Sequence, residues 1–358
     1  MKCKIYLSDE GFGHLVRQRA IYQQLCKLDE SFKATIQTSS YANVAKKIFN
    51  DAKFITKFNN IHWAKQKNGS PDLEMIHDFF ENYEVRSNQF IESEIQESEH
   101  YDFFISDFVY EAFPISQQKN IPAFGVAHFT WDWFFSKMYP MPVSYKIIEQ
   151  MQKYAQMSKV MYFPPFTPEE ILNFFGNSAK QVPLIISESQ NTIDLKEDKF
   201  KVLIMDSGAS VLSAHITQVV EQLDKIDSIH FYISEKYNIE ASNISHIPQD
   251  QFFSDYVPEV NLVITRGGFN TISECIAHRT PLLLLGETCN PEIEQNLITI
   301  KKEQLGSFIS LDSFVNSFEH SLLSFIEHEF NTIKKYMDNH EHPINGAEVI
   351  ATDILNQL

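Results

Sequence analysis

Short apolar runs and amphipathic helical segments alternate along the first half of the chain. A short run of buried-type residues bounded by Gly, Pro or polar residues is typical of a strand in a parallel sheet. Such runs predict strands at 4–7, 34–37, 54–58, 103–106, 123–126 and 183–187. Helical spacing of apolar residues predicts helices from His14 onward and over 73–99, 109–119 and 147–157. This alternation predicts an α/β domain in which helices cover a mainly parallel sheet.

The same pattern restarts in the second half of the chain. Apolar runs predict strands at 200–205, 229–233, 262–265 and 281–285. Further segments are expected as helices at 211–223, 270–277 and 346–358, a short turn at 252–256, and a polar loop ending at 294–296. Strands that lead through small-residue turns into helices, in this order, are typical of a Rossmann-like sheet.

Length and a polar, charged stretch near the middle indicate two domains. A chain of 358 residues is long for one hydrophobic core. We place an N-terminal Rossmann-like domain at 1–190, a linker at 191–198 and a C-terminal Rossmann-like domain at 199–340. Residues 341–358 are expected to form a C-terminal helix that packs back on the first domain. The predicted fold class is α/β, with two Rossmann-like domains facing each other across a cleft.

Composition and charge exclude several classes of function. The formal net charge of -17 disfavours binding to nucleic acid and any general attraction to an anionic membrane. No run of about 18 apolar residues occurs and the N-terminus has no signal-peptide core, so we expect a cytoplasmic protein without a transmembrane segment. The four cysteines lack CxxC spacing, which favours reduced, mostly buried thiols over a metal site.

Motifs of several enzyme classes are missing from the sequence. There is no GxxxxGK[ST] stretch, so the phosphate-gripping lysine of P-loop enzymes is absent. The GxSxG and HExxH patterns are missing too, which disfavours esterases and zinc proteases.

The most informative stretch is the glycine turn that follows the predicted strand 262–265. Gly267 and Gly268 lead directly into a helix, so backbone N–H groups and the positive end of the helix dipole point to one place. That arrangement suits a diphosphate. Glu274 lies one turn into the helix, where its carboxylate can reach a ribose hydroxyl. Arg266 precedes the glycines and is either a further ligand contact or a surface salt-bridge partner.

A second glycine loop, SDEGFGH, follows the first predicted strand. Gly11 and Gly13 lie beside a helix start at the carboxyl end of that strand, where α/β domains bind ligands. His14 is a candidate general base because imidazole titrates near neutral pH; the alternative is a polar residue near a helix N-cap. Arg17, one turn further, either contacts a phosphate or supports a residue that contacts the substrate; the alternative is a surface or salt-bridging residue.

Polar and aromatic residues also follow the two predicted strands 103–106 and 123–126. Asp107 and Asp132 are candidates for binding an acceptor or orienting a base, and Asp107 can alternatively cap a helix. His128 and Trp131 are further candidates for acceptor binding. The aromatic residues around Trp131 can instead belong to core or interdomain packing.

A third small-residue turn, DSGAS, follows the predicted strand 200–205. Ser207 and Gly208 can supply hydroxyl and N–H contacts to a phosphate. The alternative is an ordinary connection between a strand and a helix.

Together these motifs resemble the GT-B glycosyltransferases, in particular the lipid-linked N-acetylglucosaminyl transferases and their relatives. The resemblance rests on the GxGH loop, on RGGFNTISE, and on the proline-bearing strand and EQN that follow. It implies a second domain that binds a nucleotide sugar, UDP-linked, with Glu274 on the ribose. The implied donor contacts are Gly13, Arg17, Ser207, Gly208, Arg266, Gly267, Gly268, Asn270, Thr271, Glu274, Glu294, Gln295 and Asn296.

Two other groups of proteins are similar to parts of the chain. GFGHLVRQRAI, SDFVYEAFPISQQKNIPAFGVAHFTWDW and NPEIEQN resemble the glycosyltransferase-like N-terminal part of plant-type L-arabinokinases. The separate kinase domain of those enzymes does not fit in this chain. The GxGHxxR loop also resembles the nucleotide-sugar hydrolase of pseudaminic acid synthesis, in which the loop histidine helps to activate water; His14 matches that histidine.

The expected function is inverting transfer of a sugar from a nucleotide sugar to a hydroxyl acceptor, in bacterial glycan or glycoconjugate synthesis, with His14 and Asp107 as catalytic residues. No cofactor or metal is expected beside the nucleotide sugar, because helix ends and N–H groups can stabilise the leaving diphosphate. The acceptor is expected to be a glycan, a lipid-linked group reached by peripheral membrane contact, or a small molecule. The alternatives are a nucleotide-sugar hydrolase or epimerase that uses His14 to activate water, and a non-catalytic nucleotide-sugar-binding protein.

Overall fold

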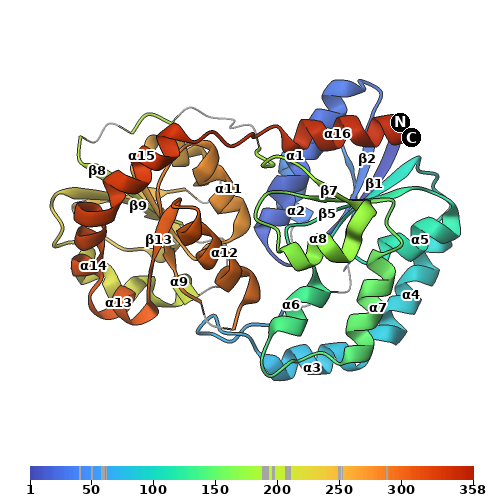
Figure 1. Cartoon of the computed structure of the whole chain (residues 1–358), viewed down its shortest axis with the longest axis horizontal. Coiled ribbons are helices and arrows are strands. Elements are labelled where there is room, and N and C mark those ends of the chain that lie inside the picture. Colours follow the sequence, from blue (N-terminus) through green and yellow to red (C-terminus); the bar gives the residue numbers. More distant parts are fainter. Residues whose placement is uncertain are drawn as a thin grey trace. The chain divides into compact units, whose positions relative to one another are not determined.

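The chain folds into two α/β units, each built on one parallel sheet (Figure 1). The computed structural model describes residues 1–39, 42–49, 51–57, 61, 63–187, 193–195, 198–205, 211–248, 251, 253–287 and 289–358. The first unit comprises Met1–Ala64, Pro71–Ser187 and Pro343–Leu358, and the second comprises Lys65–Ser70 and Glu188–His342. The expectation of two Rossmann-like α/β units is confirmed.

The first unit contains a seven-stranded parallel sheet with the strand order β3-β2-β1-β4-β5-β6-β7. Its strands are β1 (Lys2–Leu7), β2 (Lys33–Gln37), β3 (Lys53–Ile55), β4 (Phe103–Asp107), β5 (Ala123–Val126), β6 (Val160–Phe163) and β7 (Ala179–Gln181). β1 and β4 are neighbours, and the register pairs Leu7 with Asp107 at their carboxyl ends. Residues that are far apart in the sequence therefore meet where these two strands stop.

Helices cover both faces of the first sheet. They are α1 (Phe12–Leu28), α2 (Ala42–Ile48), α3 (Leu73–Glu81), α4 (Tyr83–Ile95), α5 (Ala112–Lys119), α6 (Trp131–Lys137), α7 (Tyr145–Ala155), α8 (Glu169–Phe175) and α16 (Gly346–Gln357), with a 3-10 turn at Gly176–Ser178. Tyr6 and Phe104 pack into one core with apolar residues of α4, α5 and α7. α1 and α16 pack against each other (Figure 1).

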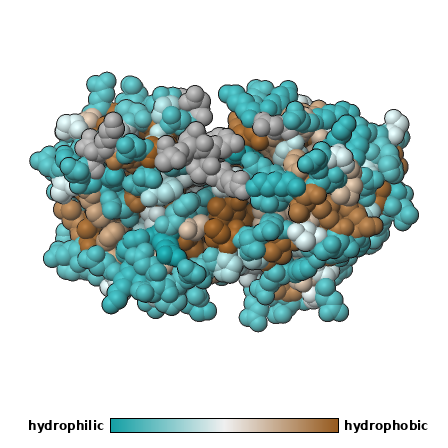
Figure 2. All heavy atoms as spheres, turned by 90° about the horizontal axis from the view of Figure 1, so that it is seen from above, coloured by the Kyte–Doolittle hydropathy of each residue, from teal (hydrophilic) through white to brown (hydrophobic). Residues whose placement is uncertain are grey.

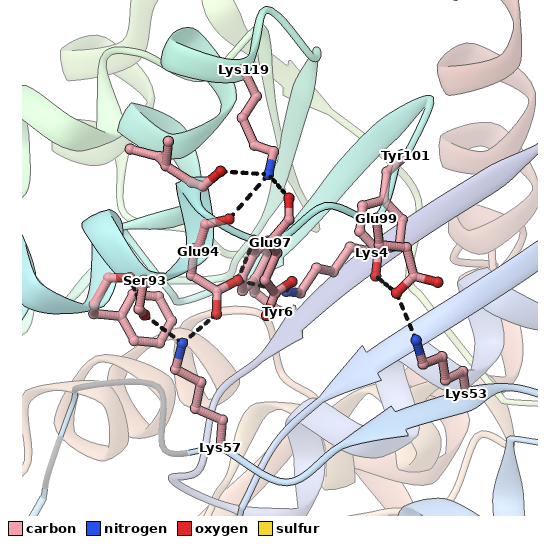
Figure 3. A network of polar contacts seen from close by, with 12 residues as sticks. Lys4, Tyr6, Lys53, Lys57, Ser93, Glu94, Glu97, Glu99, Tyr101 and Lys119 are labelled. Atoms are coloured by element: carbon pink, nitrogen blue, oxygen red, sulfur yellow. Dashed lines mark hydrogen bonds and ion pairs between the residues drawn. The ribbon is translucent and has the colours of Figure 1, made fainter.

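A buried ion pair joins β1 to α4 (Figure 3). Lys4 Nζ lies 2.5 Å from Glu94 Oε2, and both side chains are at most 1% exposed. Tyr6 donates a hydrogen bond to the same oxygen, and Lys57 Nζ lies 2.5 Å from Oε1. Burial alone raises the pKa of Glu94, but the two ammonium groups outweigh it and hold that pKa below its usual range. Lys119 donates to three carbonyl oxygens at and just after the end of α4. The helix end is thus held by these bonds as well as by the ion pairs of the Glu94 side chain.

Two expectations for the first unit are wrong. The single helix predicted over 73–99 is two helices, because the chain leaves helical geometry at Asn82, which ends α3 and precedes α4. Asn is disfavoured inside helices, because its side chain can bond to nearby backbone groups in non-helical conformations. It is therefore common at helix ends. The strand predicted at 183–187 is not part of the sheet; only Ile185 forms an isolated bridge, with Asn345. Backbone bonds from Leu184 to the chain just before α16 take the place of sheet pairing.

The second unit contains a six-stranded parallel sheet with the strand order β10-β9-β8-β11-β12-β13. Its strands are β8 (Phe200–Met205), β9 (Ile229–Ser234), β10 (Ile244–Ile247), β11 (Leu262–Thr265), β12 (Leu282–Leu285) and β13 (Gly306–Ile309). The edge strands β10 and β13 are absent from the sequence prediction. Both are only partly buried, so they lack the continuous apolar run that marks a central strand.

The helices of the second unit correct two further expectations. They are α9 (Val211–His215), α10 (Val220–Leu223), α11 (Phe269–Ala277), α12 (Pro291–Lys302), α13 (Leu311–Asn316), α14 (Phe318–Phe325) and α15 (Asn331–Asn339), with short 3-10 or π turns at Glu235–Tyr237, Phe253–Asp255, Val257–Glu259 and Ile326–Phe330. A 3-10 turn at Ile216–Val219 interrupts the helix expected over 211–223. The segment 294–296 lies within α12 and not in a loop, because Asn290 caps that helix and Pro291 begins it.

The surface and the helices give no sign of a membrane-spanning segment among the described residues. The face in Figure 2 carries mainly hydrophilic residues with scattered apolar patches. Among the helices of the described residues, none combines the length and the apolar character needed to cross a bilayer. Of the cysteines, Cys3 and Cys275 are buried, Cys26 is half-buried and Cys289 is exposed, so the expectation of mostly buried thiols holds for two of the four.

Candidate active site

The loop that follows β1 is held in place from two sides. Ser8 N donates to the carbonyl oxygen of Asp107, at the end of the neighbouring strand. Asp9 Oδ1 accepts hydrogen bonds from Thr38 Oγ1 at 2.9 Å and from the backbone N of Ser39 at 2.7 Å. Gly11 has φ +103, a conformation that favours glycine, and α1 begins directly after it. These bonds fix the point at which α1 starts.

Three side chains of α1 converge on the carboxylate of Asp107. His14 Nδ1 lies 2.7 Å from Oδ1 and Gln18 Nε2 donates to Oδ2 at 2.8 Å. Arg17 donates from Nε to Oδ2 at 3.0 Å and from Nη2 to Oδ1 at 2.6 Å. Residues three and four positions apart share one face of a helix, which explains why these three act on one partner. Asp107 is 0% exposed, so this cluster is part of the interior.

The charge of Asp107 decides which nitrogen of His14 carries the proton. Burial alone raises the pKa of Asp107, but the Arg17 guanidinium and His14 outweigh it and lower the pKa to about 2. The carboxylate is therefore ionised near neutral pH and can only accept, so His14 Nδ1–H donates to it. The lone pair of neutral His14 is then on Nε2, the nitrogen closer to Gly11. Such an imidazole can take a proton from a hydroxyl group.

His128 lies on the other side of Arg17. Arg17 Nη1 is 3.0 Å from His128 Nδ1, and both side chains are buried. Phe108 packs against both imidazoles, with its ring centroid 4.9 Å from that of His14 and 5.8 Å from that of His128. The structure thus brings together four residues that the sequence analysis proposed separately: His14, Arg17, Asp107 and His128.

Trp131 and Asp132 belong to the aromatic interior of the first unit. Trp131 is 3% exposed and stacks on Phe135, with ring centroids 5.4 Å apart. Asp132 Oδ1 accepts a 2.6 Å hydrogen bond from Tyr110. Burial and the neighbouring carboxylate both raise the pKa of Tyr110, which keeps its hydroxyl protonated. The structure does not place either residue on the Asp107 cluster, although Phe108 contacts both Trp131 and His14.

In the second unit, a glycine turn connects β11 to α11. Gly267 has φ +88, and Gly268 occupies the N-cap position without a side chain of its own to cap the helix. Asn296 Nδ2 donates to the carbonyl oxygen of Gly267 at 2.9 Å and holds the turn. Glu292 Oε1 lies 3.4 Å from the backbone N of Phe269, so a carboxylate is near the helix start in this structure. A negative group is favoured at this position by the helix dipole.

Arg266 is paired with a buried carboxylate. Arg266 Nη1 lies 3.4 Å from Glu287 Oε2, and the Glu287 side chain is only 1% exposed. Asn290 Nδ2 donates to the other oxygen of Glu287 at 3.3 Å. Lys65 Nζ lies 4.0 Å from that same oxygen. The sequence analysis does not propose Glu287, which lies two residues after the buried strand β12. Asp107, at the end of β4, has a similar position.

The remaining candidates of the second unit lie on α11 and α12. Glu274 is buried and its Oε2 lies 3.9 Å from Nε2 of His278, one turn further along α11. Asn270 and Thr271 are in the first turn of the same helix. On α12, Asn296 is buried, Gln295 is half-buried and donates to Thr299 Oγ1, and Glu294 is exposed.

Three candidates need separate mention. Gly13 is the second residue of α1. Ser207 and Gly208 lie outside the described residues. Within the described ranges, no group of three or more His, Cys, Asp or Glu side chains is arranged to hold a metal ion.

Comparisons of sequence give one informative relative. No protein-family model matches the chain. A protein of Methanosarcina acetivorans described as an uncharacterized glycosyltransferase is 24% identical over 234 residues, which cover 58% of this chain and 59% of that protein. The match therefore spans less than two thirds of the relative's length.

Comparisons of structure extend over the whole chain. The glycosyltransferase of kitacinnamycin superimposes with a TM-score of 0.67 at 12% identity, covering 100% of this chain and 99% of the other. Arabidopsis thaliana UGT89C1 in complex with UDP gives a TM-score of 0.65 at 12% identity, covering 99% and 98%. The glycosyltransferase SnogD from Streptomyces nogalater gives 0.64 at 10% identity. The expected resemblance to GT-B glycosyltransferases is confirmed.

Proposed function

We propose that the chain is a glycosyltransferase that moves a sugar from a UDP-linked donor to a hydroxyl group, with inversion and without a metal ion. One observation carries the proposal: His14 and Asp107 form a buried, hydrogen-bonded pair at the carboxyl end of a Rossmann-like sheet. Strand carboxyl ends are where such sheets keep their chemistry. The similarity to glycosyltransferases over nearly the full chain supports this reading of the pair.

In the proposed reaction, His14 is the general base. Its Nε2 accepts the proton of the acceptor hydroxyl as the oxygen bonds to the anomeric carbon of the sugar. The bond from that carbon to the diphosphate oxygen breaks, and the electron pair leaves with the nucleoside diphosphate. Asp107 stabilises the imidazolium that forms and keeps the ring oriented. A single displacement of this kind inverts the anomeric configuration.

The donor is proposed to bind to the glycine turn of the second unit. The first N–H groups of α11 and the helix dipole suit the diphosphate, whose negative charge grows as it leaves. Glu274 is proposed to accept hydrogen bonds from the ribose. The proposal of a UDP-linked donor is supported by the structural neighbour UGT89C1, which was crystallised with UDP and with quercetin. A small aromatic alcohol of that kind is a reasonable first acceptor.

The test is release of nucleoside diphosphate from a panel of UDP-, GDP- and dTDP-sugars, with and without phenolic, glycan and lipid-linked acceptors. We expect acceptor-dependent release that persists in excess EDTA and yields an inverted product by NMR. His14→Ala and Asp107→Asn are expected to lower kcat by about 100-fold or more, since general-base catalysis contributes this much. His100→Ala is the matched control, because its side chain is 84% exposed.

Each other outcome has a clear meaning. Release without any acceptor, abolished in His14→Ala, would identify a nucleotide-sugar hydrolase that uses the same base. Tight binding of a nucleotide sugar without turnover would identify a binding protein. If no nucleotide sugar binds, the proposal is wrong.

A further inference from the structure

Arg17 is buried and its guanidinium is engaged with protein groups in several directions. The residue is 1% exposed, although it carries a positive charge. Nε and Nη2 donate to the two oxygens of Asp107, and Nη1 lies 3.0 Å from His128 Nδ1. The cation also lies over the Phe108 ring, 5.4 Å from its centroid. A group enclosed in this way is poorly placed to contact a phosphate, which is one of the roles that the sequence leaves open for Arg17.

The bond between Arg17 and His128 fixes the proton of His128. A guanidinium carries only donors. The Nδ1 atom that faces Arg17 Nη1 must therefore be the acceptor, so the proton of the neutral ring is on Nε2. Protonation of Nδ1 would place two N–H groups against each other and would add a positive charge next to Arg17. Arg17 therefore favours one form of His128, neutral with an Nε2–H donor.

The situation of His14 is the reverse. Its Nδ1 also lies 3.0 Å from an arginine nitrogen, Arg17 Nη2, but that nitrogen donates to Asp107 Oδ1 at 2.6 Å. The same carboxylate oxygen is 2.7 Å from His14 Nδ1, closer than Arg17 is. An ionised carboxylate has no proton to give, so His14 Nδ1–H must donate to Asp107. The side-on, two-bond contact with Arg17 fixes the plane of that carboxylate. His14 therefore keeps its lone pair on Nε2.

We propose that Arg17 is a positioning residue that gives the two imidazoles opposite tautomers, His14 as a proton acceptor at Nε2 and His128 as a hydrogen-bond donor at Nε2. The part that concerns catalysis rests on the proposed role of His14 as the base. The assignment of tautomers stands independently of any reaction. In that reaction His14 would remove a proton at Nε2, the atom at which His128 carries one.

The experiment is NMR of the full-length protein labelled with ¹⁵N in its histidines. Long-range ¹H–¹⁵N couplings distinguish the two tautomers and the imidazolium, and His14→Gln and His128→Gln assign the two rings. In the wild type near neutral pH, we expect His14 with a proton on Nδ1 and His128 with a proton on Nε2. A wild-type His128 with its proton on Nδ1, or a fully protonated ring, would overturn the proposal without any variant.

Substitution of Arg17 provides the second measurement. In Arg17→Met the fixed pattern of His128 should be replaced by mixed tautomers or by an imidazolium, while the signals of the exposed His77 and His100 stay unchanged. In Arg17→Lys the tautomer of His128 should be less mixed than in Arg17→Met but less uniform than in the wild type. One ammonium group cannot make the two-bond contact with Asp107 and also reach His128. Wild-type-like signals of both rings in Arg17→Met would contradict the proposal.

A kinetic readout separates positioning from donor binding. We expect Arg17→Lys to lower kcat by about 10- to 100-fold, the usual effect of losing a partner that orients a reacting group. The KM for the nucleotide sugar should change by less than about threefold, which corresponds to well under 1 kcal/mol. A rise in this KM with unchanged kcat would instead make Arg17 a donor contact. If the protein shows no transferase activity at all, the NMR result still decides the tautomers.

Discussion

The polar centre of the first unit depends on one carboxylate. Asp107 accepts hydrogen bonds from His14, Arg17 and Gln18 while being 0% exposed. Loss of its negative charge would leave the buried Arg17 cation without a counter-ion, which is strongly unfavourable. The same carboxylate thus orients the proposed base and stabilises the fold around it.

This double role predicts a specific dependence of stability on pH. The folded pKa of Asp107 is about 2, whereas an unfolded aspartate titrates near 3.9. Because the folded pKa is the lower one, the stabilisation is complete above about pH 5 and disappears as the pH falls toward 2, with a size of about 2 kcal/mol. The free energy of unfolding in urea should be lower for Asp107→Asn than for the wild type near neutral pH. The difference should shrink near pH 3; a difference that is constant with pH would contradict the prediction.

At the scale of helices and strands, the sequence predicts most strands of both sheets, but not β6, β7, β10 and β13. β5, β8 and β11 are found at the predicted residues, because each contains at least three consecutive buried residues, which in β8 are Val202, Leu203 and Ile204. β10 and β13 are short edge strands with exposed positions, so periodicity does not mark them. The first half of α12, up to Asn296, is predicted as a loop, although Asn290 and Pro291 together are a good helix start.

The candidate site was predictable as residues but not as an arrangement. His14 and Asp107 each follow an apolar strand, which identifies them one at a time. Their pairing requires β1 and β4 to be neighbours, and two strands and four helices separate these elements along the chain. Gln18 has no signal of its own, because its role exists only once Asp107 lies beside α1. Pairing of distant strands is a property of topology, which local patterns do not encode.

The glycine turn before α11 offers a test that separates binding from folding. A methyl group added at Gly268 meets no atom within 4 Å, and φ is -63, so alanine fits the backbone. Gly268→Ala should therefore cost at most about 1 kcal/mol of stability, the difference between these residues at an N-cap. If a diphosphate binds at this turn, the methyl group stands in its way. We expect the Kd for UDP, measured by calorimetry, to rise about tenfold, or about 1.4 kcal/mol.

Gly306→Ala is the matched contrast to Gly268→Ala. Its added methyl group would lie 2.5 Å from the Leu282 carbonyl oxygen and 2.8 Å from Leu282 Cβ, so β12 and β13 would have to separate. This substitution should lower stability by about 1–3 kcal/mol, the range for overpacking. The two substitutions should thus show opposite patterns. Unchanged UDP binding in Gly268→Ala would show that the diphosphate does not bind at this turn.

At the scale of the whole molecule, the first unit is assembled from both ends of the sequence. α16 packs on α1 and buries Ile350 and Ile354. Asp353 on the same helix accepts a hydrogen bond from Tyr162 of β6 and pairs with Lys180 of β7. The start of the helix is closely fitted, because a methyl group on Gly346 would lie 2.1 Å from the Pro183 carbonyl oxygen. α16 is thus an integral part of the unit that carries His14.

Removal of residues 343–358 should consequently damage one unit more than the other. Exposing the apolar surfaces that α16 covers should cost the first unit about 4 kcal/mol or more, given about 1.5–3 kcal/mol for each large buried side chain. Hydrogen exchange measured by mass spectrometry should show faster exchange in β1 and β4, with little change in β11 and β12. Equal acceleration in both sheets, or none, would contradict this prediction.

The position of α16 in the sequence also sets the order in which the protein can mature during synthesis. Domains fold as their residues leave the ribosome, starting from the N-terminus. Here the helix that covers α1 emerges only after every residue of the second unit. The second unit can therefore fold first, although most of it is synthesised later. α1 stays without its packing partner until α16 has been synthesised. A chain whose translation stops before residue 346 would hold a formed glycine turn in the second unit and an unfinished first unit, so the proposed chemistry would belong to chains synthesised through α16.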